Sequence, residues 1–414
     1  MLSRRTAWLV AIAATLTMTV SYIDRQALSV LSVAVTADLH ISKQDYGLLG
    51  SAFSFAYLFG TPFAGWWIDR AGARRGLLVS VLAWSAVAAL HAVVPGFGVL
   101  FVLRLALGIA EGPGFPGAAQ TIQRILPPGD RERGFGVLFT GSSFGAMVVP
   151  PFASWVFRQA GWQVAFLVTT AAAGVLWLPL WYAVTRRQVV RARLDTAVAA
   201  GGPAEPRPRF YELVRHPLVL RALAAIFCAA PVFAFPTYWG ALFLNAMFGV
   251  NQGDVGHYLW LPPLGFDAAA IAFGQLAARQ RRAEGVPARG LVATGVALCA
   301  TLALLPLTTT PWQATIGMSI AMAGSAVVYT LVTADLLARM PLGIASFAAG
   351  ILAGAQSLAL IIVSPLIGRL VDQLHSYDVP SLALGLWAVP GGVVWLAWRP
   401  ALRYIPRGRV HRAG

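Results

Sequence analysis

The chain has 414 residues, of which 58% are hydrophobic and only 11% charged, and its formal net charge is +15. Soluble domains carry about a quarter of charged residues, so this composition excludes a soluble globular protein and indicates an all-α integral membrane protein. We expect the basic excess to reflect membrane topology and contact with anionic membrane lipids, and we expect no nucleic-acid partner.

Twelve apolar stretches of roughly twenty residues recur along the chain, and each can cross a hydrocarbon core about 30 Å thick. Arg4 and Arg5 precede the first stretch, as in a signal peptide. Its length and the eleven stretches that follow favour a retained first helix instead. The predicted spans cover residues 7–35, 46–68, 77–94, 97–122, 136–157, 164–182, 218–243, 255–277, 290–307, 315–337, 344–370 and 382–398.

The arginines between these spans predict the orientation of the chain. Nearly all of them fall on one side of the membrane, and the opposite loops hold little beyond Lys43 and Arg158. By the positive-inside rule, both termini and the long middle loop are predicted to be cytoplasmic. Cys228 and Cys299 both lie in predicted spans, which argues against a disulfide framework.

A polar segment rich in Arg, Pro and Gly, residues 186–216, separates two sets of six spans. The halves resemble each other weakly: "GWWIDRAGARRG" after the second span has a counterpart in "GQLAARQRRAEG", residues 274–285, after the eighth. Such symmetry is typical of transporters whose substrate site lies between two repeats near the membrane midplane. We expect an N-terminal six-helix bundle (1–185), a cytoplasmic linker (186–216) and a C-terminal six-helix bundle (217–414).

The loop after the second span carries a motif with a fixed spacing. It matches the G-x-x-x-D-R-x-G-x-R-R signature of the major facilitator superfamily, which the chain therefore resembles, and the resemblance implies that fold. In that superfamily the motif ties helices together on the cytoplasmic side in the outward-facing state. A positive-inside loop with an incidentally paired acid is the alternative, and the second copy lacks the acid. The motif residues are Gly65, Asp69, Arg70, Gly72, Arg74 and Arg75.

Four further strings resemble a narrower group, the anion:cation symporter family. They are "SYIDRQALSV" from Ser21, "GSAFSFAYLFGTPFAGWWIDRAG" from Gly50, "RLALGIAEGPGFP" from Arg104 and "WLPPLGFD" from Trp260. Bacterial members of that family take up organic acids such as hexuronates, aldonates and aldarates. The resemblance implies a proton-coupled symporter of a sugar acid in a bacterial inner membrane. We expect a monomer without a cofactor.

Four ionisable residues lie deep in predicted spans: Asp24 and Arg25 in the first, and Arg104 and Glu111 in the fourth. Each costs about 2.5–3.5 kcal/mol at a helix centre, so these residues need a function or mutual compensation. Arg104 and Glu111 are seven residues apart and therefore share one helix face, whereas the adjacent Asp24 and Arg25 point about 100° apart. The alternative to a transport role is that Asp24 with Arg25, and Arg104 with Glu111, form static ion pairs that hold the first and fourth spans together.

We expect Arg25 to bind the substrate carboxylate, because a guanidinium group pairs with a carboxylate through two parallel hydrogen bonds. Tyr22, three residues earlier, shares its helix face, and Tyr57 in the second span would add ring and hydroxyl contacts.

The two acids, Asp24 and Glu111, are the candidate proton sites. Burial raises the pKa of a carboxyl group and a neighbouring arginine lowers it, so a change of water access can switch protonation. Arg104 would hold Glu111 ionised in one state and release it in the other. The family resemblance implies the same roles.

Weaker candidates for substrate contact lie in other spans. Ser142 and Ser143 in the fifth are polar, but hydroxyls bonded to their own backbone are an equal alternative. Tyr238 and its neighbour Trp239 in the seventh also fit an interfacial aromatic belt. Gln356 is the main polar side chain of the eleventh span.

No metal-ligand spacing, nucleophile elbow or phosphate loop occurs in the sequence, so we expect neither an enzyme nor a metal site. Asp267 in the eighth span is an isolated acid, for which pairing near the cytoplasmic gate is one interpretation. We expect a secondary transporter that takes up an organic anion by alternating access, most simply a sugar acid such as a hexuronate or aldonate. A proton-coupled antiporter that exports a drug or metabolite is the alternative.

Overall fold

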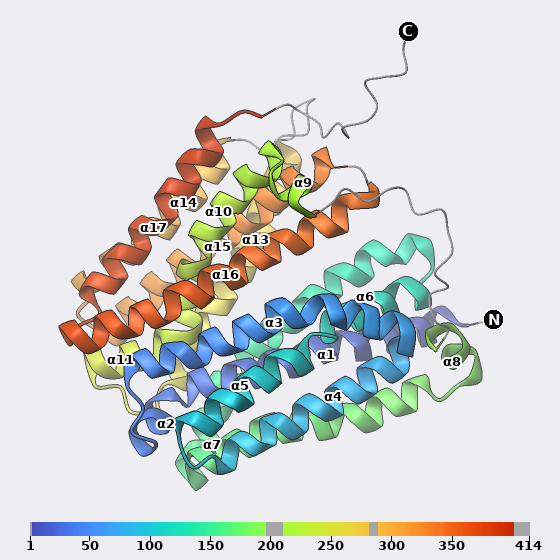
Figure 1. The fold of residues 1–414 in the computed structure, drawn as a ribbon, viewed down its shortest axis with the longest axis horizontal. Helices are drawn as coiled ribbons and strands as arrows, with labels where there is room; N and C mark the ends of the chain where they lie inside the picture. Colours follow the sequence, from blue (N-terminus) through green and yellow to red (C-terminus); the bar gives the residue numbers. More distant parts are fainter. Residues whose placement is uncertain (1, 196–209, 281–288, 341, 401–414) are drawn as a thin grey trace.

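The computed structural model describes residues 2–195, 210–280, 289–340 and 342–400, and regular structure within these ranges is helical (Figure 1). The N-terminal bundle begins with a helix that is broken at Leu31 and ends with one of 58 residues. Its elements are α1 (Arg4–Val30), α2 (Ser32–Asp38), α3 (Lys43–Ala71), α4 (Ala73–Leu90), η1 (His91–Val93), α5 (Phe97–Glu111), α6 (Gly114–Ile125) and α7 (Pro128–Thr185).

The C-terminal bundle repeats this arrangement. Two short helices, α8 (Gln188–Leu194) and α9 (Phe210–Val214), precede it, and residues 196–209 of the predicted linker lie outside the described residues. Its elements are α10 (Pro217–Ala234), η2 (Phe235–Trp239), α11 (Gly240–Phe248), α12 (Gly256–Leu259), α13 (Leu261–Arg279), α14 (Arg289–Ala300), η3 (Thr301–Leu307), α15 (Pro311–Arg339), α16 (Leu342–Leu374) and α17 (Asp378–Ala397).

These elements account for the twelve predicted spans. In the described part of the chain, nine helices are long and apolar enough to cross a membrane. The number is ten if α3, which is bent by 51° at Pro62, is counted as a single membrane span. A straight helix of 58 residues would be about 87 Å long, nearly three hydrocarbon cores, but α7 turns back at Gly161, where φ is 79°, and so crosses twice. α13, which carries Asp267 and Gln275, is less apolar and supplies the remaining span.

Small residues bring the helices of the N-terminal bundle into close contact. On α7, a side chain at Gly141 or Gly145 would collide with the backbone of α1 at Thr15 or Thr19. The Thr19 hydroxyl also donates a hydrogen bond of 3.0 Å to the carbonyl oxygen of Gly141. Close packing and interhelical hydrogen bonds are what drive association in lipid, where helices gain nothing by leaving an apolar solvent. This packing places the serines that follow Gly141 beside α1.

The two bundles contact each other mainly at one end, which we call the contact end. There the side chain of Asp372 on α16 accepts hydrogen bonds from the backbone N–H groups of Lys43 and Gln44 on α3. Arg158 donates a 2.6 Å bond to the carbonyl oxygen of Gly253. In Figure 1 the bundles converge near α2 and α11 and diverge toward the opposite end, which holds the N-terminus and α8 and which we call the terminal end.

The buried apolar residues follow the same division. One cluster lies within the N-terminal bundle around Trp84, Trp177 and Trp181. A larger one fills the C-terminal bundle and continues into the contact end of the N-terminal bundle through residues such as Leu31 and Leu49. The bundles therefore share a core at the contact end and have separate cores toward the terminal end.

Candidate functional site

An ion pair between α1 and α5 lies at the centre of the candidate site. The Arg25 Nε atom lies 2.6 Å from Glu111 Oε2, and the same carboxylate oxygen accepts a 2.8 Å hydrogen bond from the Ser21 hydroxyl. Glu111 is only 1% exposed, and its other oxygen has no hydrogen-bond partner among the described residues. The pair joins the first and fourth predicted spans, which is the kind of contact that the static alternative describes, but Arg25 binds Glu111 and not Asp24.

Three aromatic rings surround the Arg25 guanidinium group. Its central carbon lies 5.2 Å from the ring centroid of Tyr22, 5.0 Å from that of Phe53 and 4.3 Å from that of Tyr57. A guanidinium group within about 6 Å of an aromatic face is attracted by the ring quadrupole. The structure thus brings together three residues predicted as substrate contacts and adds Phe53, which lies one helical turn before Tyr57 on α3. We call these three rings the Arg25 cage.

Asp24 and Arg104 are buried without direct partners. Asp24 is 0% exposed and neither carboxylate oxygen accepts a hydrogen bond from the described residues, while Arg104, 4% exposed, has an unpartnered Nε. Asp24 lies within electrostatic reach of Glu111, Arg104 and Arg25. Buried polar groups are nearly always paired, so unsatisfied ones point to a ligand or a catalytic or transport role. Among the four intramembrane charges, only Arg25 and Glu111 form a direct ion pair.

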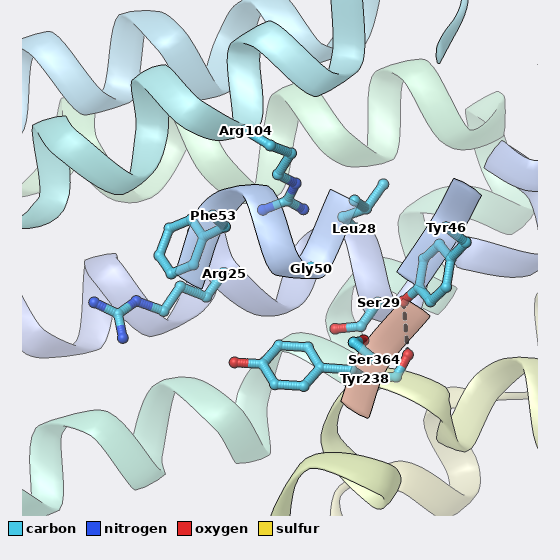
Figure 2. Close-up of a pocket in the computed structure, with 9 residues that line it drawn as sticks. All are labelled: Arg25, Leu28, Ser29, Tyr46, Gly50, Phe53, Arg104, Tyr238 and Ser364. Carbon is cyan, nitrogen blue, oxygen red and sulfur yellow. Dashed lines mark hydrogen bonds between the residues drawn. The ribbon is translucent and has the colours of Figure 1, made fainter. Parts of the chain in front are cut away.

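A small cavity lies beside these charges. Both bundles contribute to its wall, and Figure 2 shows the Tyr238 hydroxyl directed to the same side as the Arg25 guanidinium group. The lining residues are Arg25, Leu28, Ser29, Tyr46, Gly50, Phe53, Arg104, Tyr238 and Ser364.

The two predicted serines of α7 face different partners. Ser142 lies beside the hydroxyl of Tyr22 in the Arg25 cage. Ser143 donates a 2.6 Å hydrogen bond to Oδ1 of Asp267 on α13, so its hydroxyl reaches the other bundle and not its own backbone. These two neighbouring hydroxyls connect the Arg25 cage with the C-terminal bundle.

The remaining candidates of the C-terminal bundle differ in position. The backbone carbonyl oxygen of Tyr238, in the π-helical segment η2, accepts a 2.6 Å hydrogen bond from the Tyr46 hydroxyl. Trp239 is 1% exposed and packs edge-on against Tyr46 and Tyr377, so it is a core residue and the alternative of an interfacial belt is wrong for it. Gln356 is half-buried on α16 and hydrogen-bonds to no described residue.

The loop motif makes its contacts inside the N-terminal half. The Asp69 carboxylate accepts a 2.7 Å hydrogen bond from Gln120, and Arg70 lies 5.4 Å from a ring centroid of Trp66. Among the described residues, none of the motif side chains pairs with the C-terminal bundle in this conformation. Residues 281–285 of the weaker second copy lie outside the described residues.

The last two motif arginines, Arg74 and Arg75, lie 3.0 Å and 3.9 Å from the carboxylate of Asp195, at the end of α8. Gly72 adopts a positive φ of 79° and packs against the same end of α8, which leaves no room for a side chain. The helix after the sixth span is therefore held against the motif loop. Gly65 has open space around it.

Sequence reasoning missed two tyrosines, Tyr46 and Tyr329. The Tyr329 hydroxyl on α15 is buried, has no hydrogen-bond partner among the described residues, and lies within electrostatic reach of Tyr22 and Tyr238. A tyrosine in an apolar run gives no periodic signal that separates a core ring from a ligand contact. An aromatic side chain fits either role. The two tyrosines differ in their hydroxyl groups: that of Tyr46 donates to the Tyr238 carbonyl oxygen, whereas that of Tyr329 has no partner among the described residues.

Comparisons with known proteins agree with this architecture. The profile of the Major Facilitator Superfamily matches residues 14–342. The hexuronate transporter of Escherichia coli strain K12 is 26% identical over 74% of each chain. The galacturonate transporter of Dickeya chrysanthemi is 26% identical over 62% of this chain and 76% of its own length. The probable galactarate/D-glucarate transporter of Bacillus subtilis strain 168 is 23% identical over 92% and 89%.

The fold is similar to that of a solved transporter. A bacterial homolog of the human lysosomal transporter Spinster, in an inward-facing and unoccupied conformation, superposes with a TM-score of 0.73 at 17% identity, covering 97% of this chain and all of that one.

Proposed function

The chain belongs to the major facilitator superfamily, and from this premise we propose that it takes up a sugar acid together with protons across a bacterial inner membrane. Fold and relatives are those of transporters and not of enzymes. The relatives named above, which carry hexuronate, galacturonate or galactarate and glucarate, support a sugar acid as the substrate. The observation that carries the proposal is the Arg25 cage, which presents a guanidinium group beside a cavity between the bundles.

The geometry at Arg25 supports coupling between the anion and a proton. In this structure Glu111 occupies the Nε edge of the guanidinium group at 2.6 Å, and an incoming carboxylate must compete for it. A proton on Glu111 removes the charge that holds Arg25, so protonation favours anion binding and anion binding favours protonation. Asp24, buried nearby, is the second candidate proton site, and Arg104 is the cation that remains when Arg25 is engaged.

The distribution of arginines supports an orientation with both termini, α8 and the linker in the cytoplasm. The contact end is then periplasmic, and the structure is inward-facing. The motif loop, whose side chains pair with none of the described residues of the C-terminal bundle, would close against that bundle in the outward-facing state. The proposal also includes a boundary between the N-terminal bundle, the linker and the C-terminal bundle at residues 185 and 217, and a monomeric protein. The further substrate contacts that it includes are Tyr22, Tyr57, Ser142, Ser143, Tyr238 and Gln356.

Uptake into proteoliposomes tests the proposal directly. Purified protein is offered a panel of hexuronates, aldonates and aldarates, with and without an inward proton gradient. We expect accumulation of at least one sugar acid that depends on the gradient. Arg25→Ala should abolish binding, because it removes the guanidinium group that is proposed to hold the substrate carboxylate.

Glu111→Gln separates transport from coupling. The amide cannot bind or release a proton, so exchange of internal for external substrate should persist while gradient-driven accumulation is lost. Asp378→Asn, which removes an exposed acid at the contact end, serves as the control and should leave both unchanged. Accumulation by Glu111→Gln at the wild-type level would remove Glu111 from the coupling role.

A further inference from the structure

Asp267 is an acidic residue near the middle of a predicted span, and no cation among the described residues pairs with it. It lies on α13, half-buried, and among the described residues it forms no ion pair; its partner is the Ser143 hydroxyl at 2.6 Å. An ionisable group exposed to lipid would cost several kcal/mol, so such groups face the bundle interior or a water-filled path. Asp267 therefore faces the N-terminal bundle, between the two halves of the transporter.

The position of Asp267 relative to the Arg25 cage follows from helix packing. Gly145 on α7 approaches α1 so closely that a side chain there would touch Tyr22. The preceding Ser142 lies beside the Tyr22 hydroxyl, and the adjacent Ser143 reaches Asp267 in the other bundle. Two adjacent residues of α7 therefore contact the Arg25 cage and Asp267, respectively.

The C-terminal bundle also offers a buried hydroxyl group without a hydrogen-bond partner among the described residues. Tyr329 packs its ring against Phe233, yet its buried hydroxyl has no partner among the described residues and lies within electrostatic reach of Tyr22. A buried hydroxyl without a hydrogen bond costs about 1–3 kcal/mol, which a ligand can relieve. Asp267 therefore presents an acceptor to the N-terminal bundle, and Tyr329 offers a hydroxyl that is unpaired among the described residues and lies within electrostatic reach of Tyr22.

We propose that Asp267, Ser143 and Tyr329 form the subsite that recognises the hydroxyl groups of a sugar acid while Arg25 holds its carboxylate. An ionised carboxylate only accepts hydrogen bonds, and the hydroxyls of a sugar chain are donors that need such acceptors. A site built to hydrogen-bond a hydroxyl rejects an analogue that lacks it by large factors, because its own polar groups are left unpaired. The inference rests on the proposed function, and it assigns the residues that would make the substrate's hydroxyl groups, and not only its carboxylate, necessary for binding.

Competition in the proteoliposome exchange assay tests this assignment. Uptake of the labelled sugar acid is inhibited by the same unlabelled acid and by deoxy analogues that each lack one hydroxyl. The wild type should prefer the complete acid over at least one analogue by about 10-fold or more. Asp267→Ala should raise the half-inhibitory concentration of the complete acid about 10- to 100-fold and leave that of this analogue unchanged, so that the preference disappears.

Further variants keep the test sharp. Asp267→Asn retains one acceptor oxygen and should keep an intermediate preference, and Tyr329→Phe, which removes only the hydroxyl, should lower the preference even if Asp267→Ala does not fold. Asp378→Ala removes an exposed acid outside the route and should behave as wild type. Equal weakening of both ligands by Asp267→Ala, or an unchanged preference in both Asp267→Ala and Tyr329→Phe, would overturn the inference while sugar-acid uptake stands. A wild type that takes up no sugar acid would overturn the proposed function as well.

Discussion

Removing the carboxylate of Asp372 should open the contact end. Its two oxygens accept hydrogen bonds of 3.0 Å and 2.8 Å from the backbone N–H groups of Lys43 and Gln44, in the first turn of α3. These N–H groups have no partner within the helix, and a negative charge near them also interacts favourably with the helix dipole. The contact crosses the two bundles, so it exists only while the contact end is closed.

The size of the effect follows from this geometry. Loss of an N-terminal capping interaction costs about 1 kcal/mol, and the dipole interaction adds about 0.3–1 kcal/mol. Ser42, in the same bundle, still caps α3 by accepting the N–H of Asp45 at 3.0 Å, so the helix itself remains stable. Asp372→Ala should therefore shift the ratio of closed to open contact end by about 10- to 30-fold toward open.

A disulfide between the bundles reports this ratio. A Cβ atom built on Gly50 would lie 4.0 Å from that of Ser364, within the range for a disulfide, so Gly50→Cys with Ser364→Cys should cross-link in this conformation. We expect slower cross-linking when Asp372→Ala is added, and no change with Asp378→Ala, an exposed acid at the same end. Single-cysteine variants control for the native Cys228 and Cys299. An unchanged rate in the Asp372→Ala background would show that this contact does not hold the end closed.

Two further variants probe the contact end and the Arg25 cage. The Gln252 side-chain amide lies at the break of the first span, where it donates a 2.6 Å hydrogen bond to the carbonyl oxygen of Val30 and accepts a 3.1 Å hydrogen bond from the N–H of Ala34. Gln252→Ala should reduce the free energy that favours the closed contact end by about 1–3 kcal/mol and slow the same cross-link. Gln163→Ala, which changes an exposed side chain, should leave the cross-linking rate unchanged. Tyr57→Leu removes the ring that lies 4.3 Å from the Arg25 guanidinium group and should weaken sugar-acid binding about 2- to 30-fold in the exchange assay. Tyr57→Phe keeps the ring and should change the affinity little. Equal affinities for the two variants would argue against the ring contact.

The sequence predicted the spans and the charged helix faces, because both depend on local spacing. Arg104 and Glu111 do lie on one side of α5, and Tyr22 does share a face with Arg25. The sequence allowed ion pairs between the first and fourth spans but did not identify Glu111 as the partner of Arg25, since that choice depends on how α1 and α5 are aligned by other helices. A side chain at Gly108 on α5, for example, would collide with the backbone of Phe53 on α3. Such register is set by packing across the bundle.

The hydrogen bond between Ser143 and Asp267 escaped prediction for the same reason. An isolated acid and a pair of serines more than a hundred residues apart carry no mutual spacing. The sequence could show that Asp267 had no partner on its own helix, which made it a candidate for a contact elsewhere. Only the arrangement of α7 against α13 identifies that contact.

The four intramembrane charges explain why an anion and a proton should bind together. Asp24, Arg25, Arg104 and Glu111 sum to zero, yet only one of the two cations is directly paired. An anion alone would leave a net negative charge, and a proton alone a net positive charge, in a region where water screens charges poorly. Binding both restores neutrality: the anion satisfies a guanidinium group and the proton removes the acid that competed for it. In the proposed mechanism, coupling therefore follows from electroneutrality of the buried group and does not require the anion and the proton to touch.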